Sequence, residues 1–70
     1  MPKELEDLGL SEKEARVYLA ALELGQNTAE RIAKQASVNR STTYVQLDSL
    51  MKMGLISTHE EDKKTLFAPE

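Results

Sequence analysis

The sequence contains no cysteine, which excludes a disulfide framework, a thiolate metal site and a thiol nucleophile. It also lacks an apolar run near the roughly 20 residues that a membrane helix needs, because Glu23 interrupts the longest candidate, Val17 to Leu24. The opening residues 1–4 have no signal-peptide character. These absences predict a soluble chain that stays in the cytoplasm and does not enter a membrane.

Signals of catalysis are equally scarce. The single histidine, His59, stands beside acidic residues in a polar stretch, and one histidine lacks the converging ligands of a metal site. Ser11 and Ser41 have no histidine near them in the sequence, and helix starts explain both. The three glycines follow expected helix ends and form no phosphate loop. We therefore expect no enzyme activity, no metal and no cofactor.

The size and charge of the chain suit a small binding domain. Its 70 residues, 40% hydrophobic and 30% charged, predict one domain over residues 1–70 with its function on the surface. The net charge of −3 hides a basic centre, because residues 31–52 carry four basic side chains and one acidic. Residues 1–30 carry three basic and seven acidic, and residues 53–70 carry two and four. Such a centre favours a nucleic-acid surface, although a solvated helix face has the same composition.

The first expected helix begins at a capping box. Ser11 is followed three residues later by Glu14, and Gly25 supplies a stop, so a helix is expected over residues 12–24. The residues expected to face the core follow the helical repeat and are Ala15, Tyr18, Leu19 and Leu22.

Two further helices follow in quick succession. Thr28 can cap a short helix over residues 29–36, and Asn39 can cap a helix over residues 40–53 that Gly54 ends. Their expected core positions are Ala29, Ile32, Ala33 and Ala36 in the first and Thr43, Leu47, Leu50 and Met51 in the second. The connection between them is only about three or four residues long, as a helix-turn-helix requires.

The C-terminal part has the pattern of strands. Residues 55–68 predict a β-hairpin with a polar turn over residues 59–64, and residues 26–28 are placed to add a brief third strand. A short helical turn at Leu5 and Leu8 is expected ahead of the helices. The predicted fold is mainly α with a small β-hairpin: three helices plus a wing, or a winged helix-turn-helix.

This order of elements places a particular set of side chains where DNA would lie. In a helix-turn-helix, the N-terminal residues of the second helix reach base edges in the major groove, and here they are Asn39, Arg40, Ser41, Thr42, Tyr44 and Val45. Arg40 can hydrogen-bond to guanine or pair with a phosphate, and the neighbouring hydroxyls can reach either. A charged rim along the duplex would come from Arg31, Lys34, Lys63 and Lys64.

Structural explanations for the same residues stay open at this point. Arg40 can be a solvated side chain at a helix start, and Tyr44 can pack its ring on the domain and expose only its hydroxyl. Lys63 and Lys64 can serve only to keep a hairpin turn soluble, and the neighbouring acidic run 60–62 would oppose phosphate.

Two stretches of the chain resemble a known family. The runs LGLSEKEARVYLAALELG at 8–25 and TAERIAKQASVNRSTTYVQLDSLMKMGLI at 28–56 are similar to the winged helix-turn-helix of TrmB-like transcriptional regulators, many of them archaeal and sugar-responsive. The resemblance implies that Arg40, Ser41, Thr42 and Tyr44 lie on the DNA-recognition helix and that Lys63 and Lys64 lie in the wing. Asn39 stands where family members often carry proline, so their base preference does not transfer. The family's effector-binding region has no counterpart, so we expect no small-molecule effector site in this chain.

The sequence therefore predicts sequence-specific binding of double-stranded DNA in transcriptional regulation, with the helix over residues 40–53 in the major groove. The alternative is a winged-helix protein–protein interaction module without DNA binding, which the acidic flanks favour. The expected outer side of that helix carries mostly Arg, Ser and Thr, which favours DNA, and Val45 is the exception. A homodimer is compatible with a symmetric operator, although the sequence contains no evident dimer seam.

Overall fold

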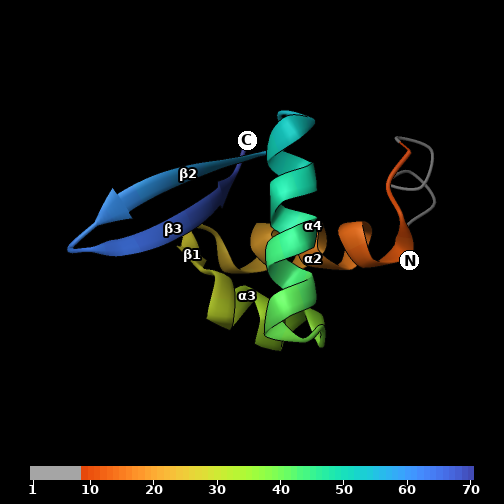
Figure 1. Ribbon diagram of the computed structural model, residues 1–70, viewed down its shortest axis with the longest axis horizontal. Helices are drawn as coiled ribbons and strands as arrows, with labels where there is room; N and C mark the ends of the chain where they lie inside the picture. Colours follow the sequence, from red (N-terminus) through yellow and green to blue (C-terminus); the bar gives the residue numbers. More distant parts are fainter. Residues whose placement is uncertain (1–8) are drawn as a thin grey trace.

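Three helices occur where their caps predict them in the computed structural model, which describes residues 9–70 (Figure 1). They are α2 (Glu12–Leu24), α3 (Ala29–Ala36) and α4 (Arg40–Lys52), with Met53 as the C-terminal cap of α4. The capping box of α2 is confirmed, since Ser11 Oγ accepts the N–H of Glu14 and Glu14 Oε1 accepts the N–H of Ser11. The helical turn expected at Leu5 and Leu8 lies outside the described residues.

The buried face of α2 differs from the predicted one. Ala15 is buried as expected, but Tyr18 and Leu19 are only half-buried and Leu22 is 48% exposed. The positions that replace them are Glu14, Val17, Ala20 and Ala21. The physical reason is that α2 packs against both α3 and α4, and its small alanines let these helices approach closely while the larger side chains lie at the border of the contact.

The core positions of α3 and α4 agree with the prediction. Every expected residue is buried except Met51, which is half-buried against the core cluster. Thr43 is wholly buried although it is polar, because its hydroxyl donates to the carbonyl oxygen of Asn39 at 2.9 Å. Between the helices, Ser37 adopts a left-handed conformation with φ of 57°, which reverses the chain within three residues.

The three strands form one antiparallel sheet in the order β1-β3-β2. β1 (Asn27–Thr28) is the expected third strand, and β2 (Ile56–Glu61) and β3 (Lys64–Pro69) form the expected hairpin. The predicted polar turn over residues 59–64 is wrong in length, because the turn is Asp62 and Lys63 alone, both with positive φ. The hairpin's outer part is exposed, so polar residues continue the strands without an apolar alternation.

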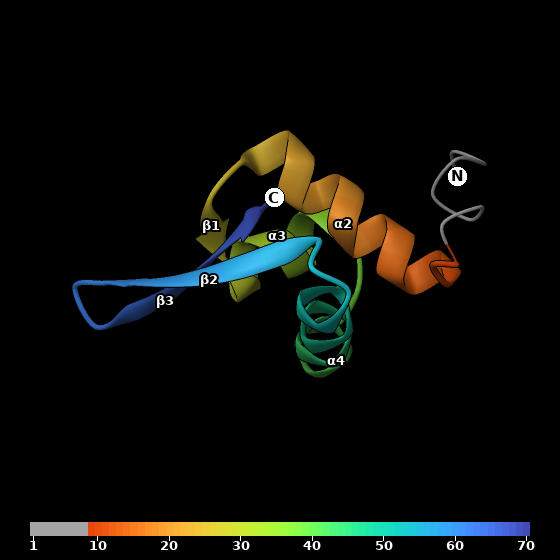
Figure 2. The same cartoon turned by 90° about the horizontal axis from the view of Figure 1, so that it is seen from above.

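α4 lies at one side of the molecule and packs on both α2 and α3. Figure 1 shows α4 in front of the other elements, and the perpendicular view in Figure 2 shows it at the lower edge of the molecule. The hairpin β2–β3 extends sideways beyond the helices in both views and forms the wing. The predicted architecture of three helices plus a wing is confirmed.

Candidate nucleic-acid interface

One side of α4 is open to solvent along the helix. We call it the outer face of α4, and its exposed residues are Arg40, Ser41, Tyr44, Val45, Asp48 and Lys52. Val45 is 64% exposed, so its apolar side chain is accessible to a binding partner. The spacing of these residues continues one helical stripe, because the opposite side of α4 buries Thr43, Leu47 and Leu50.

The start of α4 fixes the predicted contact residues in defined positions. Asn39 is exposed and its side-chain oxygen accepts the N–H of Thr42 at 2.8 Å, while its amide nitrogen can donate to a ligand. Thr42 is half-buried, whereas Ser41 is exposed at the first turn. The sequence-predicted residues of this segment therefore lie together at one end of the outer face.

Tyr44 links the outer face of α4 to the sheet. Its ring lies edge-on to buried Phe67 of β3, with centroids 6.3 Å apart and an interplanar angle of 72°. The guanidinium carbon of Arg40 lies 5.8 Å from the centroid of the same ring, within the range of a cation–π contact. Tyr44 thus packs its ring while 45% of the residue stays exposed, and it holds Arg40 on the side of α4 that adjoins β3.

A hollow of about 530 Å³ opens between β1, the first turns of α3 and α4, and β3. We call it the α3–α4–β3 hollow, and it is lined by Asn27, Thr28, Ala29, Glu30, Arg31, Arg40, Tyr44, Lys64 and Thr65. It brings together three of the predicted basic residues from three separate elements. Lys34 does not line it but adjoins a second depression beside Val38 and Asn39, and Lys63 lies exposed at the hairpin turn.

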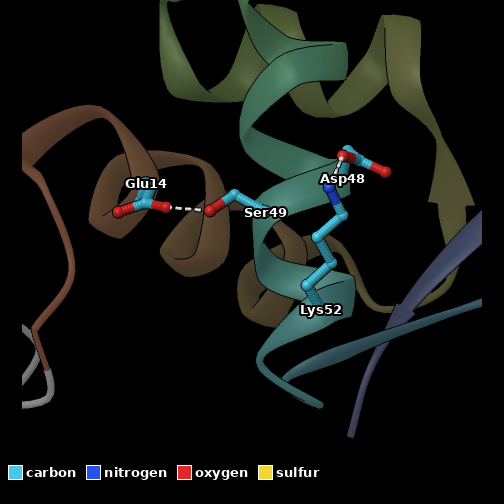
Figure 3. Close-up of polar contacts among 4 residues, drawn as sticks. All are labelled: Glu14, Asp48, Ser49 and Lys52. Carbon is cyan, nitrogen blue, oxygen red and sulfur yellow. Dashed lines mark hydrogen bonds and ion pairs between the residues drawn. The ribbon is translucent and has the colours of Figure 1, made fainter.

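A polar contact on the inner side of α4 was not part of the sequence prediction. Glu14 of α2 is 9% exposed, and Ser49 of α4 donates its hydroxyl to the second carboxylate oxygen (Figure 3). The backbone N–H of Ser11 holds the pKa of Glu14 below its ordinary value, the Ser49 hydroxyl lowers it further, and burial opposes both. Sequence revealed Glu14 only as a cap, because its partner in α4 is 35 residues away.

An ion pair lies toward the C-terminal end of the outer face. Lys52 Nζ is 3.1 Å from Asp48 Oδ2, one helical turn away, and Figure 3 shows this pair projecting from α4 away from Glu14 and Ser49. Both side chains are mostly exposed, so the pair contributes little to stability. Its effect is to neutralise the one carboxylate of the outer face.

Residues 9–70 contain neither a cluster of metal ligands nor a membrane-spanning helix. No group of three or more histidine, aspartate or glutamate side chains in this range is placed to hold a metal ion. Within the same range, none of the helices is long and apolar enough to cross a bilayer.

The sequence has relatives among transcriptional regulators and uncharacterised proteins. Residues 5–69 match the family described as sugar-specific transcriptional regulator TrmB. An uncharacterised protein of Methanocaldococcus jannaschii is 39% identical over 57 residues, which cover 81% of this chain and 48% of that protein. The chain thus spans about half the length of this curated relative.

Solved structures share the arrangement of helices and wing. TrmBL2, an archaeal chromatin protein with a novel mode of DNA binding, is 31% identical, with a TM-score of 0.77 over 89% of this chain and 23% of that chain. A MarR-family regulator from Silicibacter pomeroyi is 25% identical, with a TM-score of 0.85 over 97% of this chain and 47% of that chain. A DNA-binding protein of Sulfolobus solfataricus, Sso10a-2, shares the fold at 16% identity, with a TM-score of 0.69 over 87% of this chain and 64% of that chain. The chain therefore belongs to the TrmB family of sugar-specific transcriptional regulators, and its fold is the winged helix-turn-helix of such regulators.

Proposed function

We propose that this chain binds double-stranded DNA sequence-specifically in transcriptional regulation and inserts α4 into the major groove. The observation that carries the proposal is the outer face of α4, which no other described element covers and which is polar at its N-terminal end. The major groove is wide enough to admit an α-helix, and a helix-turn-helix presents this end of its second helix to the bases.

Three side chains in the first two turns of α4 have the chemistry of base recognition. Ser41 and Thr42 are short hydrogen-bond donors and acceptors, and Val45 offers an apolar contact of the kind that thymine methyl groups accept. The amide donors of Asn39 stand beside them at the cap. Contacts to the DNA backbone are assigned to Arg31, Lys34, Tyr44, Lys63 and Lys64, and Arg40 can reach either a guanine or a phosphate.

Two copies would serve a symmetric operator. Dimeric helix-turn-helix proteins place their recognition helices about 34 Å apart, one turn of the duplex. We propose that residues 1–70 act as one DNA-binding domain in the cytoplasm and that two such domains meet on the DNA or through further contacts.

The test is a titration of the ¹⁵N-labelled chain with a mixed-sequence duplex at low salt, followed at each backbone amide by NMR. We expect shifts concentrated at residues 39–45, weaker shifts at Arg31, Lys34 and the 60–64 segment, and loss of all of them as salt rises. Lys13→Gln is the matched control, because it removes one exposed positive charge from α2, which contributes no residue to the proposed interface. It should leave the pattern unchanged.

If the duplex causes no amide shifts, the remaining candidate function is a protein-interaction module. Tyr44 and Val45 are large, adjacent and exposed, as the anchors of a protein-interaction module would be. If no amide shifts with protein and duplex both near a millimolar, DNA binding is refuted and the outer face of α4 becomes the site to search for a protein partner.

A further inference from the structure

The α3–α4–β3 hollow carries a net positive charge. Arg31, Arg40 and Lys64 line it from three elements, while Glu30 is its one acidic residue, which leaves a surplus of two positive charges. Within residues 9–70 the ion pair that lies under 4 Å is Lys52–Asp48, so none of the three cations of the hollow has a carboxylate partner there. Like charges held close together favour an anion between them.

We propose that this hollow holds one phosphate of the DNA backbone and that Arg40 contacts this phosphate and does not read guanine. The inference rests on the proposed DNA binding and refines it. Under this proposal, Arg40 at the first turn of α4 positions the protein on the DNA backbone. Ser41, Thr42 and Val45 contact the bases.

The position of Arg40 favours phosphate over a base edge. Its guanidinium lies against the Tyr44 ring, and that ring leans on Phe67 of β3, so the side chain is held toward the sheet. A residue that reads guanine from the first turn of a recognition helix must extend away from the protein into the groove. Arg40 lines the same hollow as Lys64 and Thr65 as well as the neighbouring depression beside Lys34, and its planar fork of donors matches two oxygens of a phosphate.

The other lining groups complete a suitable surface for a phosphodiester. Lys64 and Arg31 add charge, and Tyr44 and Thr65, which also line the hollow, each carry a hydroxyl that can donate to a phosphate oxygen. The hollow begins at the N-terminal end of α3, whose dipole adds to the positive potential.

The exposure of the cations indicates a polymeric anion and not a free one. Arg31, Arg40 and Lys64 are all solvent-exposed, and such charges hold a small ion weakly because water screens them. A duplex supplies the same phosphate chemistry with the release of condensed counterions, which strengthens binding to exposed cations. We therefore assign the site to DNA, with free phosphate as the alternative source for the experiment to distinguish.

The experiment measures DNA affinity by fluorescence anisotropy for the wild-type chain, Arg40→Gln, Lys64→Gln and the control Lys13→Gln. Each protein is titrated at 50 to 200 mM salt into a duplex selected from a random pool and into duplexes with single base-pair changes in that sequence. Circular dichroism checks that each variant is folded, and since these side chains are exposed the variants should fold normally.

A phosphate contact makes a quantitative prediction. Each lost contact should make the slope of log K against log salt shallower by about 0.9, so between 50 and 200 mM the wild-type affinity falls roughly 3.5-fold more than the variant's. Arg40→Gln and Lys64→Gln should both show this change, weaken all duplexes equally and preserve the order of preference among them. Lys13→Gln should retain the wild-type slope.

Three results would contradict the proposal, and each contradicts a different part of it. If Arg40→Gln keeps the wild-type slope and changes which base pair is preferred, Arg40 reads a base, and the phosphate assignment fails while DNA binding stands. If the wild-type chain binds no duplex, the proposed function itself fails. If inorganic phosphate alone saturates amide shifts at Arg31, Arg40 and Lys64, and displaces DNA beyond the effect of sodium chloride at equal ionic strength, the hollow is a free-anion site and the DNA assignment is overturned.

Discussion

Replacing Ser49 by alanine should show how much the polar contact between α2 and α4 stabilises the fold. The substitution removes one oxygen atom and with it one donor to the Glu14 carboxylate, which is only 9% exposed. A hydrogen bond to a charged group contributes about 1.5–3 kcal/mol, whereas alanine is favoured over serine within a helix by roughly 0.5 kcal/mol. We expect the free energy of unfolding to fall by about 1–2.5 kcal/mol at neutral pH.

The substitution Ser49→Ala should also change how the free energy of unfolding depends on pH. The pKa of Glu14 is lower in the folded chain than its ordinary value of 4.5, so this carboxylate adds stability above about pH 4.5 that is lost as pH falls through the folded-state pKa. Ser49→Ala removes one of the groups that lower this pKa, which then moves back toward 4.5. The stability gap between the wild-type chain and Ser49→Ala should therefore narrow in acid.

Urea denaturation followed by helical circular dichroism, at pH 7 and at several values below 4.5, measures both effects. Ser41→Ala is the matched control, because Ser41 is an exposed serine on the same helix. The reasoning is refuted if Ser49→Ala is no less stable than Ser41→Ala at pH 7, or if the gap widens as pH falls.

Substitutions at three further positions test other parts of the structure. Leu47→Ala, at a wholly buried position of α4, should lower the free energy of unfolding by about 2–5 kcal/mol, and a loss below about 1 kcal/mol in urea denaturation would contradict its place in the core. Asn39→Ala should cost about 0.5–2 kcal/mol through loss of the N-cap, and the rescue expected from Asn39→Asp distinguishes capping from other effects. Lys63→Gly should raise the thermal midpoint, because residue 63 has φ of 65° and glycine adopts it without a Cβ clash. If Lys63 contacts DNA as proposed, the same variant should bind duplex more weakly, and unchanged affinity would remove it from the interface.

Local signals predicted the helices and the strands because the chemistry that starts and stops them is local. The capping box of Ser11 and Glu14 and the Asn39 cap each satisfy backbone donors within three residues, so the sequence alone places them. The hairpin was predicted too, but its turn was not, because the exposed outer strands carry polar residues such as His59 and Glu60 on a surface that requires no apolar alternation.

The face of α2 that enters the core was decided only by the tertiary structure. Two apolar stripes with the same helical spacing overlap in its sequence, one through Ala15, Tyr18, Leu19 and Leu22 and the other through Val17, Ala20, Ala21 and Leu24. Periodicity cannot choose between them. In the structure, α3 and α4 pack mainly on the stripe that contains Val17, Ala20 and Ala21, because a helix in contact with two neighbours buries its small residues.

For the candidate site too, some features were predictable from the sequence and others depend on the tertiary structure. Residue types and their places on elements identified the basic side chains and the first turn of α4, because these depend on nearby sequence. The convergence of Arg31, Arg40 and Lys64 on one hollow, and the Tyr44 ring that holds Arg40 toward β3, depend on how a helix, a second helix and a strand pack together. The sequence therefore determined which residues are candidates for DNA contact, and only the tertiary structure decided which of them lie together, since that depends on distances between segments far apart in the chain.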